Sequence, residues 1–124
     1  MRRRSMAPIT VLIVEDEPII RMTVADDLAD AGFNVCEAAN ASDALVVLSA
    51  CADIRVIFTD IDMPGELNGI EFAHVVRDRW PPIEIIITSG HKRVGPAQMP
   101  ARSCFFPKPY THTDIVSAIK RMLG

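Results

Sequence analysis

The sequence is poor in cysteine, which excludes the covalent ways of holding a small fold together. Its 124 residues include only three cysteines, Cys36, Cys51 and Cys104, and none belongs to a C-x-x-C pair. An odd number of widely spaced cysteines is atypical of a disulfide framework or a zinc site. A chain of this length buries roughly two-thirds of its unfolded surface, so it can fold as one domain without such links. We expect reduced and mostly buried thiols in an intracellular protein.

The sequence also lacks a long apolar run and an excess of basic residues. No apolar segment approaches the roughly 18 residues of a membrane span, and 13 Lys and Arg against 16 Asp and Glu give a net charge of −3. Proteins that coat nucleic acids usually show a clear basic excess. The apolar segment behind the basic start is too short for a signal peptide. We therefore expect a cytoplasmic protein that binds neither nucleic acid nor a membrane, with a flexible basic tail at residues 1–8 and one domain at residues 9–124.

What the sequence does contain is an alternation of strand and helix patterns. Apolar, β-branched runs predict five strands, at residues 10–14, 33–38, 54–59, 83–88 and 103–106. Apolar residues at helical spacing predict helices from Pro18 to a stop at Gly32, over 41–50, over 69–80, and after Thr111. Glycine and prolines between Ser89 and Arg102 predict that a fourth helix there is short, irregular or absent. The alternation predicts a doubly wound α/β fold with a parallel sheet.

Carboxylates gather at the ends of the predicted strands, where open parallel sheets bind their ligands. The polar residues at these ends are Glu15, Asp16, Asp60, Asp62, Thr88, Ser89 and Lys108. Two carboxylates about 4 Å apart repel by on the order of 4 kcal/mol at an effective dielectric near 20, and a bound cation relieves this repulsion. An oxygen-only site suits Mg²⁺ better than Zn²⁺. With a metal present, a carboxylate could attack phosphorus while Lys108 and Thr88 contact the phosphoryl oxygens.

Four segments of the sequence resemble the receiver domains of two-component response regulators. They are Val14–Pro18, Phe58–Gly65, Ile87–Gly90 and Phe106–Pro109, which occur in the family's order and on the expected strand ends. The resemblance extends from Ile9 to Gly124. It implies a flavodoxin-like fold with five parallel strands in the order 2-1-3-4-5. It also implies a signalling module, not an enzyme, that accepts phosphate from a sensor histidine kinase or a histidine phosphotransfer protein and then contacts an unknown downstream protein.

The same resemblance gives each site residue an expected role. Asp60 is the phosphoacceptor, Thr88 is the switch hydroxyl, and Lys108 contacts a phosphoryl oxygen. Phe105 occupies the position of the aromatic switch residue. The expected Mg²⁺ site consists of Glu15 through a water, Asp16, Asp60 and the backbone carbonyl of Asp62.

Three features depart from the commonest pattern of this family. The loop over residues 63–69 is one residue longer. Asp62 places an acid near the entry route of a hydrolytic water, so the lifetime of the phosphoryl group stays open. Phe105 lacks the hydroxyl of the tyrosine that many members carry, so a switch at this position must work by packing.

Two other functions are compatible with parts of this pattern. Asp60-Ile61-Asp62 also resembles the D-x-D motif of haloacid-dehalogenase phosphatases, which form an aspartyl phosphate as well. In that family the motif follows the first strand and a further acidic motif follows the lysine, where this chain offers only Asp114. A receiver-like interaction domain that ignores phosphate is the other alternative. Because the chain ends just after the last predicted helix, we expect a stand-alone regulator in preference to a receiver excised from a longer protein.

Overall fold

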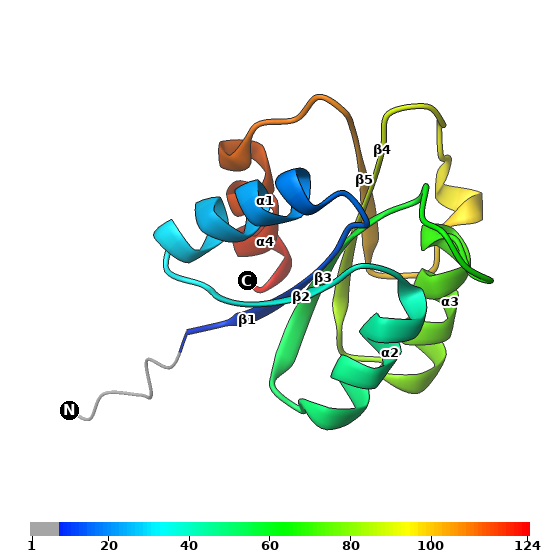
Figure 1. Ribbon diagram of the computed structural model, residues 1–124, viewed down its shortest axis with the longest axis horizontal. Coiled ribbons are helices and arrows are strands. Elements are labelled where there is room, and N and C mark those ends of the chain that lie inside the picture. The colour runs from blue at the N-terminus through cyan, green and yellow to red at the C-terminus, as the bar shows by residue number, and fades with distance from the viewer. Residues whose placement is uncertain (1–7) are drawn as a thin grey trace.

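The structure, a computed structural model, describes residues 8–124 and contains one parallel sheet flanked by helices (Figure 1). The strands are β1 (Thr10–Val14), β2 (Asn34–Ala38), β3 (Ile54–Asp60), β4 (Glu84–Ser89) and β5 (Ser103–Pro107). The helices are α1 (Pro18–Asp30), α2 (Ala41–Ala50), α3 (Gly69–Arg79) and α4 (His112–Met122), with a 3₁₀ turn, η1, at Pro96–Gln98. The sheet order is β2-β1-β3-β4-β5 and every pairing is parallel. This confirms the predicted doubly wound fold. The predicted tail, except Pro8, lies outside the described residues.

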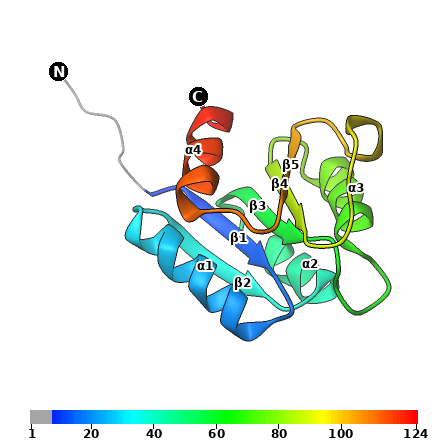
Figure 2. The same cartoon turned by 90° about the horizontal axis from the view of Figure 1, so that it is seen from above.

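The helices divide between the two faces of the sheet, with α1 and α4 on one face and α2 and α3 on the other (Figure 2). The position of β1 between the two helical layers explains why its residues 11–14 are all apolar. Val11 and Ile13 belong to the core under α1 and α4, whereas Leu12 and Val14 belong to the core under α2 and α3. All four side chains are fully buried, and each contributes about 1.5–3 kcal/mol by burial.

The edge strand β2 is less buried than the central strands, and the three cysteines are likewise only partly buried. Cys36 in β2, Cys51 after α2 and Cys104 in β5 are free and half-buried. They pack at the margins of the two cores. The prediction of reduced, mostly buried thiols fits this arrangement, because all three residues are only partly exposed. Within residues 8–124, β2 pairs only with β1 and β5 only with β4, so these two strands are the edges of the sheet.

Helix α3 begins very close to the end of β3, which fixes the position of Asp60. The N-cap residue Asn68 accepts hydrogen bonds from the N–H groups of Ile70 and Glu71, and the Glu71 carboxylate accepts one from Asn68 N–H. The next residue, Gly69, donates its N–H to the Ile61 carbonyl at 3.0 Å. A Cβ atom at this position would collide with the Asp60 carbonyl. Glycine is therefore required here because α3 and the end of β3 are in backbone contact.

The segment between β4 and β5 contains no helix longer than η1, as predicted. Side chains of α3 hold this segment through its carbonyl oxygens. Arg77 donates to the carbonyls of Ala101 at 2.8 Å and Arg102 at 3.2 Å. His74 Nε2 lies 3.0 Å from the Gln98 carbonyl. Polar contacts with α3 thus help to hold this irregular segment in place.

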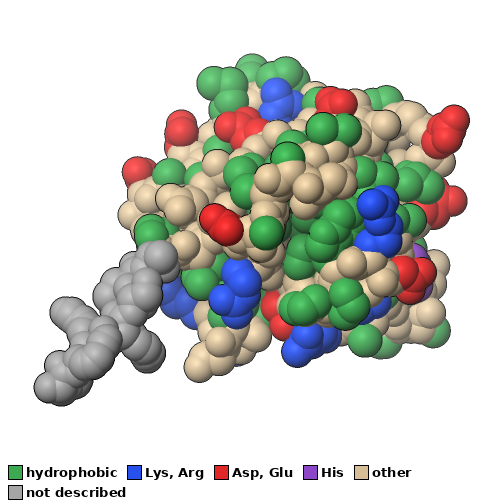
Figure 3. Space-filling view, turned by 90° about the horizontal axis from the view of Figure 1, so that it is seen from below, with side chains coloured by type: hydrophobic (Ala, Val, Ile, Leu, Met, Phe, Trp, Pro, Cys, Tyr) green, Lys and Arg blue, Asp and Glu red, His purple; other side chains and the backbone are tan. Residues whose placement is uncertain are grey.

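The surface shows no segregation of charge on the face drawn in Figure 3. Acidic and basic side chains of the described residues are interspersed there among hydrophobic ones. Within residues 8–124, none of the helices has the length and apolar character needed to cross a bilayer.

Candidate functional site

Five polar side chains converge at the carboxyl edge of the sheet, where the ends of four strands place them. Glu15 and Asp16 follow β1, Asp60 is the last residue of β3, Thr88 lies in β4 and Lys108 follows β5. The parallel register pairs Asp60 with Thr88 across adjacent strands. Backbone hydrogen bonds continue beyond the sheet, from Glu15 N to Ala38 O and from Lys108 N to Ser89 O, both at 3.0 Å. The sheet and these two hydrogen bonds therefore fix the backbone of four of the five residues, and Asp16 directly follows Glu15.

Three of these side chains form an acidic cluster. Carboxylate oxygens of Glu15, Asp16 and Asp60 all lie within 4.8 Å of one another. Glu15 is 3% and Asp60 5% exposed, so water does little to screen their repulsion. Burial raises the pKa of Glu15 to about 6, and the nearby Asp60 charge adds to the rise. A hydrogen bond from Glu17 N–H at 3.1 Å acts in the opposite direction.

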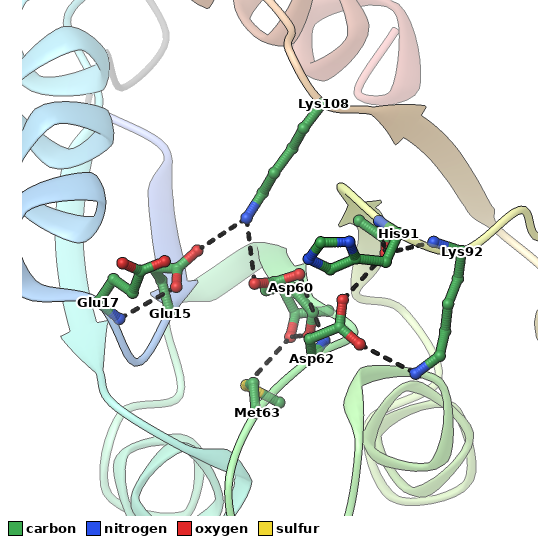
Figure 4. Close-up of polar contacts among 10 residues, drawn as sticks. Glu15, Glu17, Asp60, Asp62, Met63, His91, Lys92 and Lys108 are labelled. Atoms are coloured by element: carbon green, nitrogen blue, oxygen red, sulfur yellow. Dashed lines mark hydrogen bonds and ion pairs between the residues drawn. The ribbon is translucent and has the colours of Figure 1, made fainter.

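Lys108 supplies the positive charge next to this cluster (Figure 4). Its ammonium group lies 3.1 Å from Asp60 Oδ2 and 3.5 Å from Glu15 Oε1. Burial alone would lower the pKa of Lys108, but the hydrogen bond to Asp60 and the two carboxylate charges outweigh it and the pKa is raised. Lys108 thus stays charged beside the acceptor position throughout the neutral range.

Thr88 carries a hydroxyl group that is buried at the edge of the site. The residue is 1% exposed, and its Oγ1 has no hydrogen-bond partner among the described residues. An unpaired buried hydroxyl costs about 1–3 kcal/mol, so such groups usually have a partner at some stage of function. Because Thr88 is in register with Asp60, a phosphoryl group on Asp60 would bring acceptor oxygens to this edge.

Asp62 does not join the acidic cluster with its side chain. Its carboxylate accepts hydrogen bonds from Ser89 Oγ at 3.1 Å and from Lys92 Nζ at 2.9 Å. These contacts, that with Lys92 first, lower the pKa of Asp62. Its backbone N–H lies 3.3 Å from Asp60 Oδ1, so the backbone of Asp62 stays at the site. The sequence alone assigns no role to Ser89 or Lys92.

Phe105 lies away from the acidic cluster. It pairs with Ile87 in the β4–β5 register and packs, half-buried, on the core under α2 and α3. The neighbouring Phe106 points to the opposite core. A second aromatic side chain, Tyr110, lies nearer to Lys108 in the chain and meets the Phe58 ring edge-on at 5.5 Å. Burial raises the pKa of Tyr110 to about 12, so it stays neutral. A switch role for Phe105 stays a prediction.

The residues at this edge fit a hard divalent cation. All donors in the acidic cluster are oxygen atoms, the set that Mg²⁺ prefers. The charged groups here are Glu15, Asp16, Asp60, Asp62, Lys92 and Lys108. Their four carboxylates and two ammonium groups leave two excess negative charges, which one divalent cation would neutralise. Mg²⁺ binding at an acidic pocket is typical of the family that the sequence resembles, and the acidic pocket is present.

Comparison with known families decides the class of the chain. The family model described as the response regulator receiver domain matches residues 11–120. The chain belongs to this family. The match covers nearly the whole sequence and includes every residue of the candidate site.

Individual relatives agree with this assignment. An NtrX-like response regulator of Rickettsia felis is 35% identical to the receiver in an alignment of 121 residues, which covers 94% of this chain and 25% of that protein. The sensor kinase CckA of Brucella abortus is 32% identical in an alignment of 118 residues, which covers 92% of this chain and 12% of that protein. The chain thus spans about a quarter or less of the length of these relatives. Whether it acts as a stand-alone regulator stays a prediction.

Solved structures show the same fold. A response regulator receiver protein from Sinorhizobium medicae superposes with a TM-score of 0.88 at 28% identity, covering 96% of this chain and 97% of that one. The receiver domain of the hybrid histidine kinase CckA gives a TM-score of 0.79 at 26% identity, covering 93% and 99%. The predicted flavodoxin-like architecture of the receiver is therefore confirmed.

Proposed function

We propose that this receiver accepts a phosphoryl group on Asp60 from the phosphohistidine of a sensor histidine kinase or a histidine phosphotransfer protein. The observation that carries the proposal is the unpaired Thr88 hydroxyl, buried one strand away from Asp60 and in register with it. The acidic cluster and Lys108 supply the charges that such a transfer needs.

In the proposed reaction, an Asp60 carboxylate oxygen attacks phosphorus and forms an O–P bond. The P–N bond of the donor breaks, and the imidazole leaves with the electron pair and takes up a proton. Lys108, already 3.1 Å from Asp60, would neutralise a phosphoryl oxygen, and Thr88 would donate its free hydrogen bond to another. Mg²⁺ would neutralise the charge that develops on the phosphoryl oxygens. Glu15 through a water, Asp16, Asp60 and the Asp62 carbonyl are the proposed residues that hold it.

The proposed output is a change of protein contacts, not catalytic turnover. Receivers are in general signalling modules, and the buried environment of Asp60 suits an adduct that persists. A haloacid-dehalogenase-like phosphatase would instead hydrolyse a small phosphate ester repeatedly, and an assay of released phosphate separates the two. An interaction domain that ignores phosphate would bind its partner equally well after Asp60→Asn.

A cleft beside the site is the proposed seat of the phosphodonor protein. It has a volume of about 380 Å³ and lies between α1 and α4. Its lining includes Ile20, Tyr110, Ile115 and Lys108, so it opens directly next to the acidic cluster. On α1, Ile19 and Met22 are 79% and 57% exposed. A helical donor surface that buried these apolar side chains would bring its phosphohistidine to Asp60.

We also propose that the receiver domain spans residues 9–124 behind a basic tail, and that it works in the cytoplasm. The half-buried free thiols suit a reducing compartment.

The decisive experiment is intact-protein mass spectrometry after incubation with Mg²⁺ and acetyl phosphate. We expect one added phosphoryl group on the wild type, none on Asp60→Asn, and none after chelation of the metal. Asp78→Asn is the matched control, because Asp78 is an exposed acid of α3 outside the site. An adduct on Asp60→Asn, or none on the wild type, would refute the proposal.

A further inference from the structure

The β4–η1 loop holds the side chain of Asp62 on the outer rim of the site. Figure 4 shows Asp62 beside Asp60, with Lys92 and Lys108 on opposite sides of the two carboxylates. One Asp62 oxygen accepts from Ser89 Oγ at 3.1 Å, and the other from Lys92 Nζ at 2.9 Å. Both oxygens of Asp62 are therefore engaged by the segment that directly follows Thr88.

Ser89 also folds this segment so that Lys92 reaches Asp62. Its Oγ accepts hydrogen bonds from His91 N–H at 3.2 Å and from Lys92 N–H at 3.0 Å. Since the hydroxyl accepts twice, its single proton is left for Asp62. The backbone of Lys92 and its ammonium group are thus positioned by the same side chain.

The charge of Asp62 matters because phosphodonors are anionic. A donor that approaches Asp60 must pass a carboxylate two residues away, whose backbone N–H is only 3.3 Å from Asp60 Oδ1. An unpaired carboxylate at that place would repel the donor and would be free to rotate toward Asp60. Lys108 does not offset this charge, because its contacts are with Glu15 and Asp60.

We propose that Lys92 is a positioning residue, which neutralises the Asp62 carboxylate and holds it away from Asp60 so that an anionic phosphodonor can reach the acceptor. This inference rests on the proposed function, since it concerns the same reaction. Lys92 acts on the donor through Asp62. Its removal should therefore slow the arrival of anionic donors and leave the acceptor chemistry intact.

The test measures the rate of adduct formation on the intact chain by mass spectrometry, with acetyl phosphate as the probe. Lys92→Gln should slow the reaction about five-fold at low salt, the effect of one uncompensated charge about 8 Å from a dianion in water. The loss should shrink at about 0.5 M salt. It should also be smaller with phosphoramidate, which carries less net negative charge. Lys92→Arg should react as the wild type does.

Asp62→Asn combined with Lys92→Gln is the discriminating variant, because it removes both charges. We expect this double variant to react faster than Lys92→Gln alone, because the unpaired carboxylate is gone as well. Lys120→Gln, which removes an exposed lysine at the end of α4, is the matched control and should react normally. Thermal unfolding of each variant shows whether the fold is retained.

The outcomes separate this inference from the proposed function. A wild type that forms no adduct refutes the proposed function, and the role of Lys92 falls with it. A normal rate for Lys92→Gln, in a wild type that does react, overturns the role of Lys92 alone. A double variant as slow as Lys92→Gln also overturns it, since Lys92 would then act on the donor directly.

Discussion

Two buried threonines on adjacent strands allow the argument about Thr88 to be tested by stability alone. Thr59 in β3 is fully buried, and its hydroxyl donates to the Asp60 carbonyl at 3.0 Å. Thr88 in β4 is equally buried, but its hydroxyl has no partner among the described residues. Replacement of threonine by valine preserves the shape of the side chain and removes the hydroxyl. The two substitutions should therefore have opposite effects on the free energy of unfolding.

The expected magnitudes follow from the hydrogen-bond status of each hydroxyl. Thr88→Val relieves an unpaired buried hydroxyl and should raise the free energy of unfolding by about 1 kcal/mol. Thr59→Val loses a satisfied hydrogen bond and should lower it by about 1 kcal/mol. The difference of about 2 kcal/mol corresponds to roughly 1 M between the urea midpoints, at an m-value near 2 kcal/mol/M.

Urea unfolding of the metal-free protein, followed by circular dichroism, measures both variants against the wild type. Equal m-values would show that only stability has changed. If Thr88→Val were destabilised as much as Thr59→Val, the Thr88 hydroxyl would have a partner in solution. The reasoning that it waits for a phosphoryl oxygen would then be refuted.

Three further predictions concern the positions around the acceptor. Gly69→Ala should lower the free energy of unfolding by about 1–3 kcal/mol, because its Cβ would meet the Asp60 carbonyl. Gly95→Ala, where a Cβ meets open space, is the control, and equal effects in urea unfolding would contradict the close approach of α3. Ile19→Glu should slow phosphotransfer from a phosphohistidine protein several-fold but leave the rate with acetyl phosphate unchanged, whereas Val46→Glu on α2, 69% exposed in the wild type, should change neither. Equal rates for both variants with the protein donor would rule out the cleft between α1 and α4 as its seat. Because the pKa of Glu15 rises from 4.5 in the unfolded chain to about 6 in the fold, the folded protein binds the extra proton. Stability without metal should therefore fall as pH rises, by on the order of 2 kcal/mol in total between pH values well below 4.5 and well above 6. Glu15→Gln should flatten this dependence in urea titrations at each pH, and an unchanged slope would assign it to another group.

The sheet could be predicted from sequence because its strands carry strong local signals. The β-branched and apolar run Thr10–Val14 coincides with β1, since a strand buried on both faces favours such residues along its whole length. The helix over Gly69–Arg79 begins where its capping residue Asn68 stands. Local sequence signals predicted less about the segment between β4 and β5. There, glycine and prolines showed that a long helix was excluded, but not that Arg77 would hold the segment by its carbonyls.

The predicted site residues differ in how their side chains are fixed, and this explains what the sequence missed. Lys108 reaches Asp60 across 48 residues of chain, yet its place was predictable because each of them lies at the end of a regular strand. Lys92 reaches Asp62 across 30 residues, but it lies in an irregular loop whose path depends on the Ser89 hydroxyl. No local pattern encodes that path. The sequence shows that an acid stands at position 62. Only the contacts of Asp62 in the structure show that its charge is already balanced before a phosphodonor arrives. Strand ends therefore define the chemistry of this edge, whereas the loop after β4 sets the electrostatic environment through which a donor must approach.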